Sequence, residues 1–189
     1  NQGDLAQVEA DYRIYGTLSD VASGQSGNRI SLQRFVLGVL LDDVLREASQ
    51  RLQLMSKGRY ILKRKLERSK GNKTSGLELE IEDAYSSATR PANTLSGGES
   101  FMAALALALG LSDVVQSYSG GIRLETLFID EGFGSLDMES LELAVQTLID
   151  LRKTGRTIGV ISHVSEMREQ MQLRIDIEPS PLGSRIAVV

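Results

Sequence analysis

The stretch that decides the fold is LETLFIDEGFGSLD, which runs from Leu124 to Asp137. Its apolar run ends at two adjacent carboxylates, Asp130 and Glu131, and glycines and a third acid follow. Burying two carboxylates costs free energy unless a cation or a reacting proton compensates their charge. The stretch therefore predicts a strand that delivers a metal ligand and a base to one point.

Strands and helices alternate on the C-terminal side of this stretch. After the strand TLFID come a helix over Met138 to Lys153, the strand TIGVIS, a short helix near Val164 to Gln172, and the terminal strands RIDIE and RIAVV. The inward positions expected in the first helix are Leu141, Ala144, Val145, Leu148 and Ile149. Apolar strands that alternate with helices are typical of a parallel sheet. The expected fold class is therefore α/β, with a mainly parallel sheet and flanking helices.

The residues before this stretch predict two helices and a hairpin. Ser31 is the expected N-cap of a long helix that Gly58 ends, because apolar residues then repeat at helical spacing. The runs YILKRKL and LELEIED are expected to pair as an antiparallel hairpin, since Leu77, Leu79 and Ile81 alternate with acids. AYSSATRPAN is expected to be a loop, and the apolar run FMAALALALGL predicts a buried helix.

The N-terminus carries an apolar seam. Leu5, Val8, Tyr12 and Tyr15 are spaced by three, four and three residues, as in a coiled coil. The same spacing fits an amphipathic helix that packs on its own domain, so both interpretations stay open.

Composition limits the metal and the location. The 189 residues are 41% hydrophobic and 24% charged, as in an ordinary globular protein. With no cysteine and one histidine, thiolate sites and multi-histidine zinc sites are excluded, so any metal must be a hard ion bound through oxygen. The sequence has no long uninterrupted apolar run and no signal-peptide pattern at its start. We therefore expect a cytoplasmic protein with no membrane partner.

One segment is strongly basic, although the net charge of the chain is −4. Residues 57–73 hold eight basic residues and one acid. Such a surface is suited to the phosphates of double-stranded DNA, while a merely solvated hairpin is the other interpretation. The residues assigned to DNA binding are Lys63, Lys65, Arg68, Lys70 and Lys73.

Four short motifs occur in order along the chain. They are LSGGE at residues 95–99, LFIDE at 127–131, SLD at 135–137 and ISH at 161–163. LSGG precedes a helix, so its backbone N–H groups and the Ser96 hydroxyl predict an anion site; a simple N-cap is the alternative. Asp130 is expected to hold a hydrated Mg²⁺, and Glu131 to orient and deprotonate an attacking water. His163 ends the next strand, where its imidazole could touch a terminal phosphate.

These motifs resemble the signature, Walker B, D-loop and switch-histidine elements of ABC-type ATPases. Together with RFVLGVLLDDVL and LMSKGRY, they are similar to the SbcC family of SMC-like ATPases, the large subunit of the SbcCD DNA nuclease complex, over residues 15–189. The resemblance makes Asp130 the magnesium-side acid, Glu131 the catalytic base and His163 the switch residue. It assigns the signature to Ser96, Gly97, Gly98 and Glu99, and the D-loop to Ser135, Leu136 and Asp137.

No G-x-x-x-x-G-K-[ST] phosphate loop occurs in this sequence. The resemblance implies that this Walker A loop belongs to an N-terminal lobe, separated from a C-terminal lobe by a long antiparallel coiled coil. Residues 1–18 are then the end of the returning coiled-coil helix, and residues 19–189 are the C-terminal lobe of the head. The implied cofactors are ATP and Mg²⁺. The implied partners are the N-terminal Walker A lobe, a second head in a homodimer, an SbcD-like nuclease subunit and double-stranded DNA.

Two other functions stay open on the sequence. A transporter nucleotide-binding subunit would need a Walker A loop upstream in the same domain, and the 94 residues before Leu95 contain none. A non-catalytic DNA-binding scaffold could use the basic hairpin, but would have no chemical need for Glu131 and His163.

Overall fold

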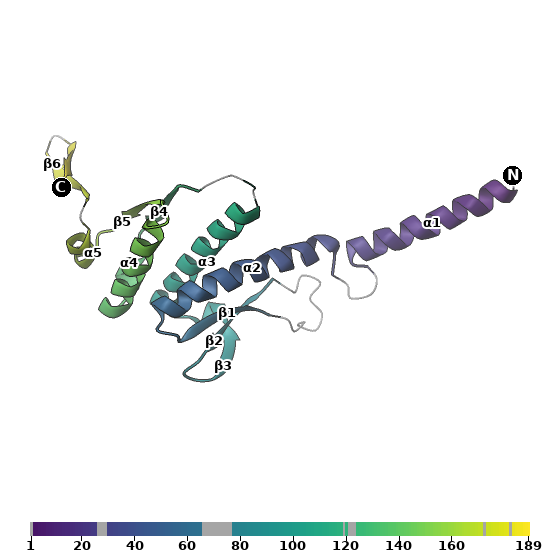
Figure 1. The fold of residues 1–189 in the computed structure, drawn as a ribbon, viewed down its shortest axis with the longest axis horizontal. Helices are drawn as coiled ribbons and strands as arrows, with labels where there is room; N and C mark the ends of the chain where they lie inside the picture. The colour runs from purple at the N-terminus through teal and green to yellow at the C-terminus, as the bar shows by residue number, and fades with distance from the viewer. Residues whose placement is uncertain are drawn as a thin grey trace.

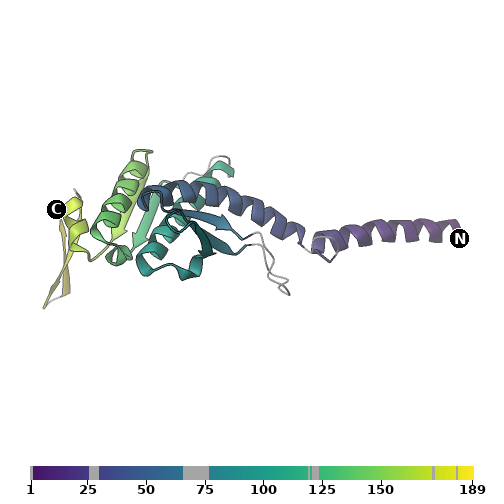
Figure 2. The ribbon, with the colours of Figure 1, turned by 90° about the horizontal axis from the view of Figure 1, so that it is seen from below.

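The computed structural model shows an elongated molecule (Figure 1). It describes residues 2–25, 30–65, 77–118, 120, 124–171, 173–181 and 183–189. Helix α1 (Gln2–Ser23) projects from the body of the protein at one end, and the C-terminal strands lie at the other end (Figures 1 and 2).

Helices α2 (Leu32–Met55) and α3 (Gly97–Tyr118) pack along each other and, together with α4 (Met138–Arg152), supply most of the core. Ser31 caps α2 as predicted, because its side chain accepts a hydrogen bond from the backbone of Arg34 at 3.3 Å. The two helices approach closely at Gly110, where an added Cβ would lie 2.8 Å from the carbonyl oxygen of Val44. An 18-residue window of α3 is apolar enough to cross a membrane by composition, but 44% of it is buried inside the protein, as in a core helix.

A three-stranded antiparallel sheet lies against α2. Its order is β1 (Tyr60–Arg64), β2 (Leu79–Asp83) and β3 (Ala88–Pro91), and the β1–β2 pairing confirms the predicted hairpin. The expected loop AYSSATRPAN is partly wrong, because β3 lies within it. This short, mostly exposed strand has no apolar alternation, and it pairs with β2 as a second hairpin across the turn at residues 84–87.

The parallel pair β4 (Thr126–Asp130) and β5 (Thr157–Ile161) is connected through α4 (Met138–Arg152), as predicted. In β4, Leu127 and Ile129 pack against the core, while Phe128 points away from it and is 72% exposed. Helix α4 buries four of the five predicted positions. Ile149 is the exception at 39% exposure, and Leu151 is buried instead.

The parallel sheet is smaller than the sequence suggests, since β4 and β5 are the only parallel partners among the described strands. Beyond α5 (Ser165–Gln170), strands β6 (Ile175–Ser180) and β7 (Gly183–Val188) form a separate antiparallel pair. The connection between them is too short for the crossover that parallel pairing requires. The fold class is α/β, as predicted, with a parallel pair, antiparallel pairs and flanking helices among the described residues.

Helix α1 leaves its apolar seam uncovered. Val8, Tyr12 and Tyr15 are all exposed, so these residues do not pack on the other described residues of the chain. The side chain of Leu5 lies outside the described set. The helix continues to Ser23, and the domain boundary at residue 18 stays a prediction.

Candidate functional site

The residues predicted for hydrolysis meet at the carboxyl ends of β4 and β5. Asp130 ends β4 beside Ile161, and the Glu131 N–H donates to the Ile161 carbonyl oxygen at 2.9 Å. His163 follows two residues after β5, and its Nδ1 lies 2.7 Å from Oε2 of Glu131. The parallel register therefore brings Asp130, Glu131 and His163 to one exposed edge.

The backbone at Glu131 is held in an unfavourable conformation. Its φ of 62° lies in the left-handed region, which non-glycine residues adopt at a cost. Gly132 follows with φ 98°, and a Cβ there would overlap the ring of Phe101. Phe101 in turn packs edge-to-face on Phe133, with ring centroids 4.8 Å apart. This aromatic contact fixes the turn after Glu131 against α3.

The described residues offer one carboxylate for a metal ion at this edge. They contain no group of three or more His, Cys, Asp or Glu side chains that could hold a metal ion. Asp130 offers one exposed carboxylate at the strand end. Mg²⁺ commonly takes one or two carboxylates and completes its shell with waters and phosphate oxygens. Asp130 therefore fits an ion that arrives with a nucleotide.

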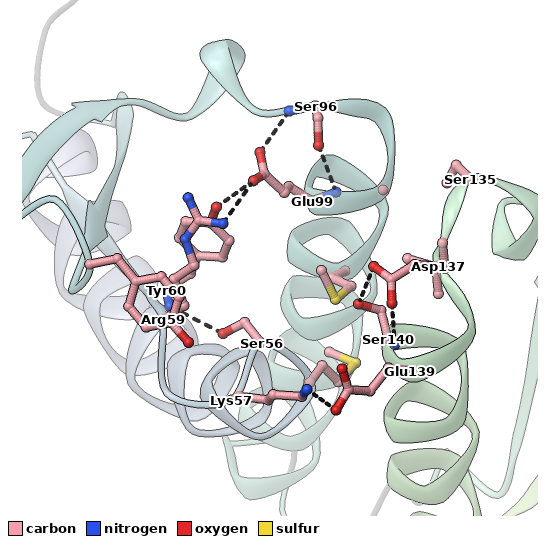
Figure 3. A pocket seen from close by; sticks show the side chains of 15 residues that line it. Ser56, Lys57, Arg59, Tyr60, Ser96, Glu99, Ser135, Asp137, Glu139 and Ser140 are labelled. Carbon is pink, nitrogen blue, oxygen red and sulfur yellow. Dashed lines mark hydrogen bonds and ion pairs between the residues drawn. The ribbon is translucent and has the colours of Figure 1, made fainter.

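A second region lies in a pocket of about 330 Å³ between the end of α2, the start of α3 and the start of α4 (Figure 3). Most residues predicted for the signature and the D-loop line it: Ser96, Gly98, Glu99, Ser135, Leu136 and Asp137. Gly97, Asp130, Glu131 and His163 are not part of its lining. The structure thus separates the signature and D-loop residues from the acids and His163 that end the parallel strands.

The signature and the D-loop touch at one point. A Cβ added to Gly98 would lie 2.6 Å from the carbonyl oxygen of Ser135, so only glycine fits there without a backbone shift. Ser135 donates its hydroxyl to the carbonyl oxygen of Gly132 at 2.7 Å. Asp137 caps α4 by accepting from the backbone and hydroxyl of Ser140, and these hydrogen bonds lower the pKa of Asp137.

Glu99 points into the protein. Its Oε2 accepts from the Ser96 N–H at 2.9 Å, and the Glu99 N–H donates to the Ser96 hydroxyl at 3.4 Å, which is a capping box. Its Oε1 accepts from the Tyr60 hydroxyl, and Arg59 and Arg90 lie at ion-pair distances of 3.7 and 3.5 Å. Burial raises the pKa of Glu99, but the bonds from Tyr60 and Ser96 outweigh burial and leave that pKa lowered.

Sequence reasoning missed this network around Glu99. The capping box was readable, because serine followed three residues later by glutamate is its pattern. The contacts with Tyr60 and Arg59 were not readable, since they join residues about forty positions apart. Ser96 therefore acts as a helix cap, and it also keeps an exposed position at the mouth of the pocket.

The basic hairpin is partly neutralised in the described residues. Lys63 forms an ion pair with Glu82, and Lys65 lies 3.9 Å from Glu80 on the neighbouring strand. The other residues assigned to DNA lie outside the described set: Arg68, Lys70 and Lys73. The charge of β1 alone is thus a weak indication of a DNA site.

Comparison with known sequences gives one family and close relatives. Residues 72–150 match the family model described as SbcC/RAD50-like, Walker B motif. The chain is 67% identical over 182 residues to the SbcC subunit of nuclease SbcCD from Vibrio cholerae, and the match covers 96% of this chain and 18% of that protein. The corresponding protein of Staphylococcus saprophyticus is 46% identical over 91% of this chain and 17% of its own length. The chain thus spans less than a fifth of these relatives.

Solved structures share the fold. An Smc head domain with an extended coiled coil from Pyrococcus furiosus, bound to the C-terminal domain of ScpA, aligns over the whole chain and 43% of its own length with a TM-score of 0.65. A structure from work on ATP-driven dimerisation and DNA-stimulated activation of SMC ATPases aligns over 82% of this chain and 89% of its own, with a TM-score of 0.63. Both are 18% identical, so the likeness concerns the fold.

Proposed function

Because this chain belongs to the SbcC family and spans about 18% of the length of a 67% identical relative, we propose that it is the C-terminal lobe of an ATP-hydrolysing head. The observation that carries the proposal is the meeting of Asp130, Glu131 and His163 at the carboxyl ends of two parallel strands. A magnesium–nucleotide complex would bind at this edge.

Each residue at the edge has a distinct role in the proposal. Asp130 would hold the Mg²⁺ that arrives with ATP and neutralises charge on the phosphates. Glu131 accepts the proton of the attacking water as general base. His163, 2.7 Å from Glu131, orients that carboxylate and would contact the terminal phosphate.

The N-terminal Walker A lobe of the same protein would complete the site. The outward face of β4–β5 is evidence for such a lobe, because its apolar side chains lie open: Phe128 is 72% exposed and Ile161 is 56% exposed. An apolar strand face of this kind is normally covered. The lobe would supply the phosphate loop that this sequence lacks.

The proposed assembly is a homodimer of heads in the cytoplasm. The exposed Ser96 of one head would meet ATP bound by the other head, and hydrolysis would regulate a nuclease subunit that acts on double-stranded DNA. The relatives are named as subunits of the nuclease SbcCD, which supports the nuclease partner. The exposed apolar seam of α1 is evidence that this helix pairs with the outgoing helix of a coiled coil.

The first test separates the two lobes. The purified chain is expected to show no magnesium-dependent ATP hydrolysis above background, because it has no phosphate loop to hold the nucleotide. Adding the separately produced N-terminal segment of the full-length protein should restore turnover, measured as phosphate release. Substantial hydrolysis by this chain alone would contradict the proposal.

A second test concerns DNA. Replacing Lys70 and Lys73 by Glu in the full-length protein should weaken duplex binding for every sequence. It should also flatten the salt dependence, because each phosphate contact contributes about −0.9 to the log–log slope. Lys63→Glu with Lys65→Glu should do less, since Glu82 and Glu80 already pair with these lysines. Anisotropy titrations at several salt concentrations measure the affinity and its salt dependence. If both were unchanged in the Lys70 and Lys73 variant, the hairpin would be a solvated surface with no role in DNA binding.

A further inference from the structure

The first residue of β1, Tyr60, contacts the signature loop through its side-chain hydroxyl. The Tyr60 backbone N–H donates to the hydroxyl of Ser56, in the turn that follows α2, at 3.1 Å. The phenol donates to Oε1 of Glu99, while Oε2 of the same carboxylate accepts from the Ser96 N–H (Figure 3). A single carboxylate therefore joins Tyr60 to Ser96.

The surroundings of Tyr60 hold this hydroxyl in place. Its side chain is 1% exposed, and the guanidinium of Arg59 lies 4.6 Å above its ring. Arg59 is itself anchored, since its Nε and Nη2 donate to the Asp83 carboxylate at 3.2 and 2.9 Å. Burial and the bond to Glu99 raise the pKa of Tyr60 to about 12, so the phenol stays a donor throughout the working pH range.

The rotamer of Glu99 decides where the Ser96 backbone lies. The two hydrogen bonds between Ser96 and Glu99 close a ring around the first turn of α3. Without the Tyr60 bond, Oε1 would keep only the ion pair with Arg59 at 3.7 Å, while Arg90 lies 3.5 Å from Oε2, so the carboxylate would tend to rotate toward these cations or toward water. That rotation would also withdraw Oε2 from the Ser96 N–H.

We propose that Tyr60 is a positioning residue for the signature loop, acting through Glu99 on Ser96. The inference rests on the proposed function, in which Ser96 meets the ATP of a partner head. Glu99 is then a support for the loop and makes no contact with the nucleotide. Tyr60 thereby sets the geometry of a site that its own head does not contain.

The test uses the full-length dimer and Tyr60→Phe, which removes the hydroxyl and keeps the buried ring. The variant should lower kcat about tenfold, the size of a lost charge-assisted hydrogen bond, with little change in KM or in ATP binding. Tyr118→Phe is the matched control. It removes a phenol that donates to the carboxylate of Asp43 at 2.8 Å, at an exposed position at the other end of α3, outside the pocket. This control should keep wild-type turnover.

Mixed dimers separate positioning from a general loss of stability. One dimer carries Tyr60→Phe in one head and a disabled Walker A lysine in the other, so that one composite site stays whole. A second dimer carries both lesions in the same head, so that its only working site uses the altered signature. The second dimer should turn over about tenfold more slowly than the first. Equal rates in the two dimers would overturn the inference.

Ser96→Arg in the same two arrangements shows which idea has failed. If Ser96→Arg distinguishes the arrangements and Tyr60→Phe does not, only the positioning role is lost. If neither substitution distinguishes them, the signature does not act across the dimer and the proposed function itself is wrong.

Discussion

Replacing Glu131 by Gln in the full-length dimer is expected to lower ATP hydrolysis by about 10²- to 10⁴-fold, the usual contribution of a general base. The amide keeps the shape of the side chain and its position beside His163, but it cannot accept the proton of the attacking water. ATP binding should therefore be retained. Steady-state phosphate release measures the first effect, and a nucleotide titration measures the second.

Two further substitutions give this experiment its controls. Glu142→Gln makes the same isosteric change at an exposed position of α4 and should leave turnover unchanged. Asp130→Ala should instead weaken binding of the magnesium–nucleotide complex, because it removes the carboxylate that would hold the ion. If Glu131→Gln and Asp130→Ala reduced binding equally, the roles of the two acids would be assigned wrongly.

The sequence predicts those parts of the fold that depend on local residue patterns. The serine cap of α2, the alternation in β2, and the apolar strand ending at Asp130 each occupy a few consecutive residues. The errors lie where the apolar pattern does not decide. Strand β3 has no apolar alternation and is defined only by its pairing with β2 across a short turn, and Ile149 lies on a helix face that its neighbours leave uncovered.

The candidate site divides in the same way. The sequence was enough to predict that three residues lie close together, because parallel strands in register end at the same edge of the sheet. These residues are Asp130, Glu131 and His163. The pocket between the signature and the D-loop could not be predicted in this way, because its lining residues come from segments far apart in the sequence that meet only in the folded protein. The inward turn of Glu99 depends on Tyr60, which begins β1, and on Arg59, which precedes it. A sequence motif identifies the residues of a loop, but the packing around the loop determines which of those residues are accessible to a ligand.

Gly98 illustrates how packing links the two loops. Its close approach to Ser135 means that the signature helix and the D-loop turn cannot move independently without opening this contact. Ser135 is tied to Gly132, the residue after Glu131. A displacement of the signature by a partner's nucleotide would therefore reach the turn that carries the proposed base.

Ser96 carries the second large effect, and its two possible roles predict different outcomes. As a helix cap it needs only a short side-chain acceptor, and aspartate caps as well as serine, as Asp137 does for α4. As a donor to a phosphate across the dimer it must not be negative. Ser96→Asp should thus leave the stability of the lobe within about 0.5 kcal/mol, yet lower turnover by about 100-fold, the size of a lost oxyanion donor.

Ser96→Arg should be at least as damaging, because it places bulk and misdirected donors where the two heads meet. The first ATP-binding event should stay nearly intact, since the signature does not contact the nucleotide of its own head in this arrangement. ATP-driven dimerisation, followed by light scattering, should be lost. A dimer with Ser96→Arg in one head and a disabled Walker A lysine in the other should still occlude one nucleotide, because both lesions fall in one composite site. With both lesions in one head no site is whole, so equal occlusion in the two dimers would mean that Ser96 serves only its own helix.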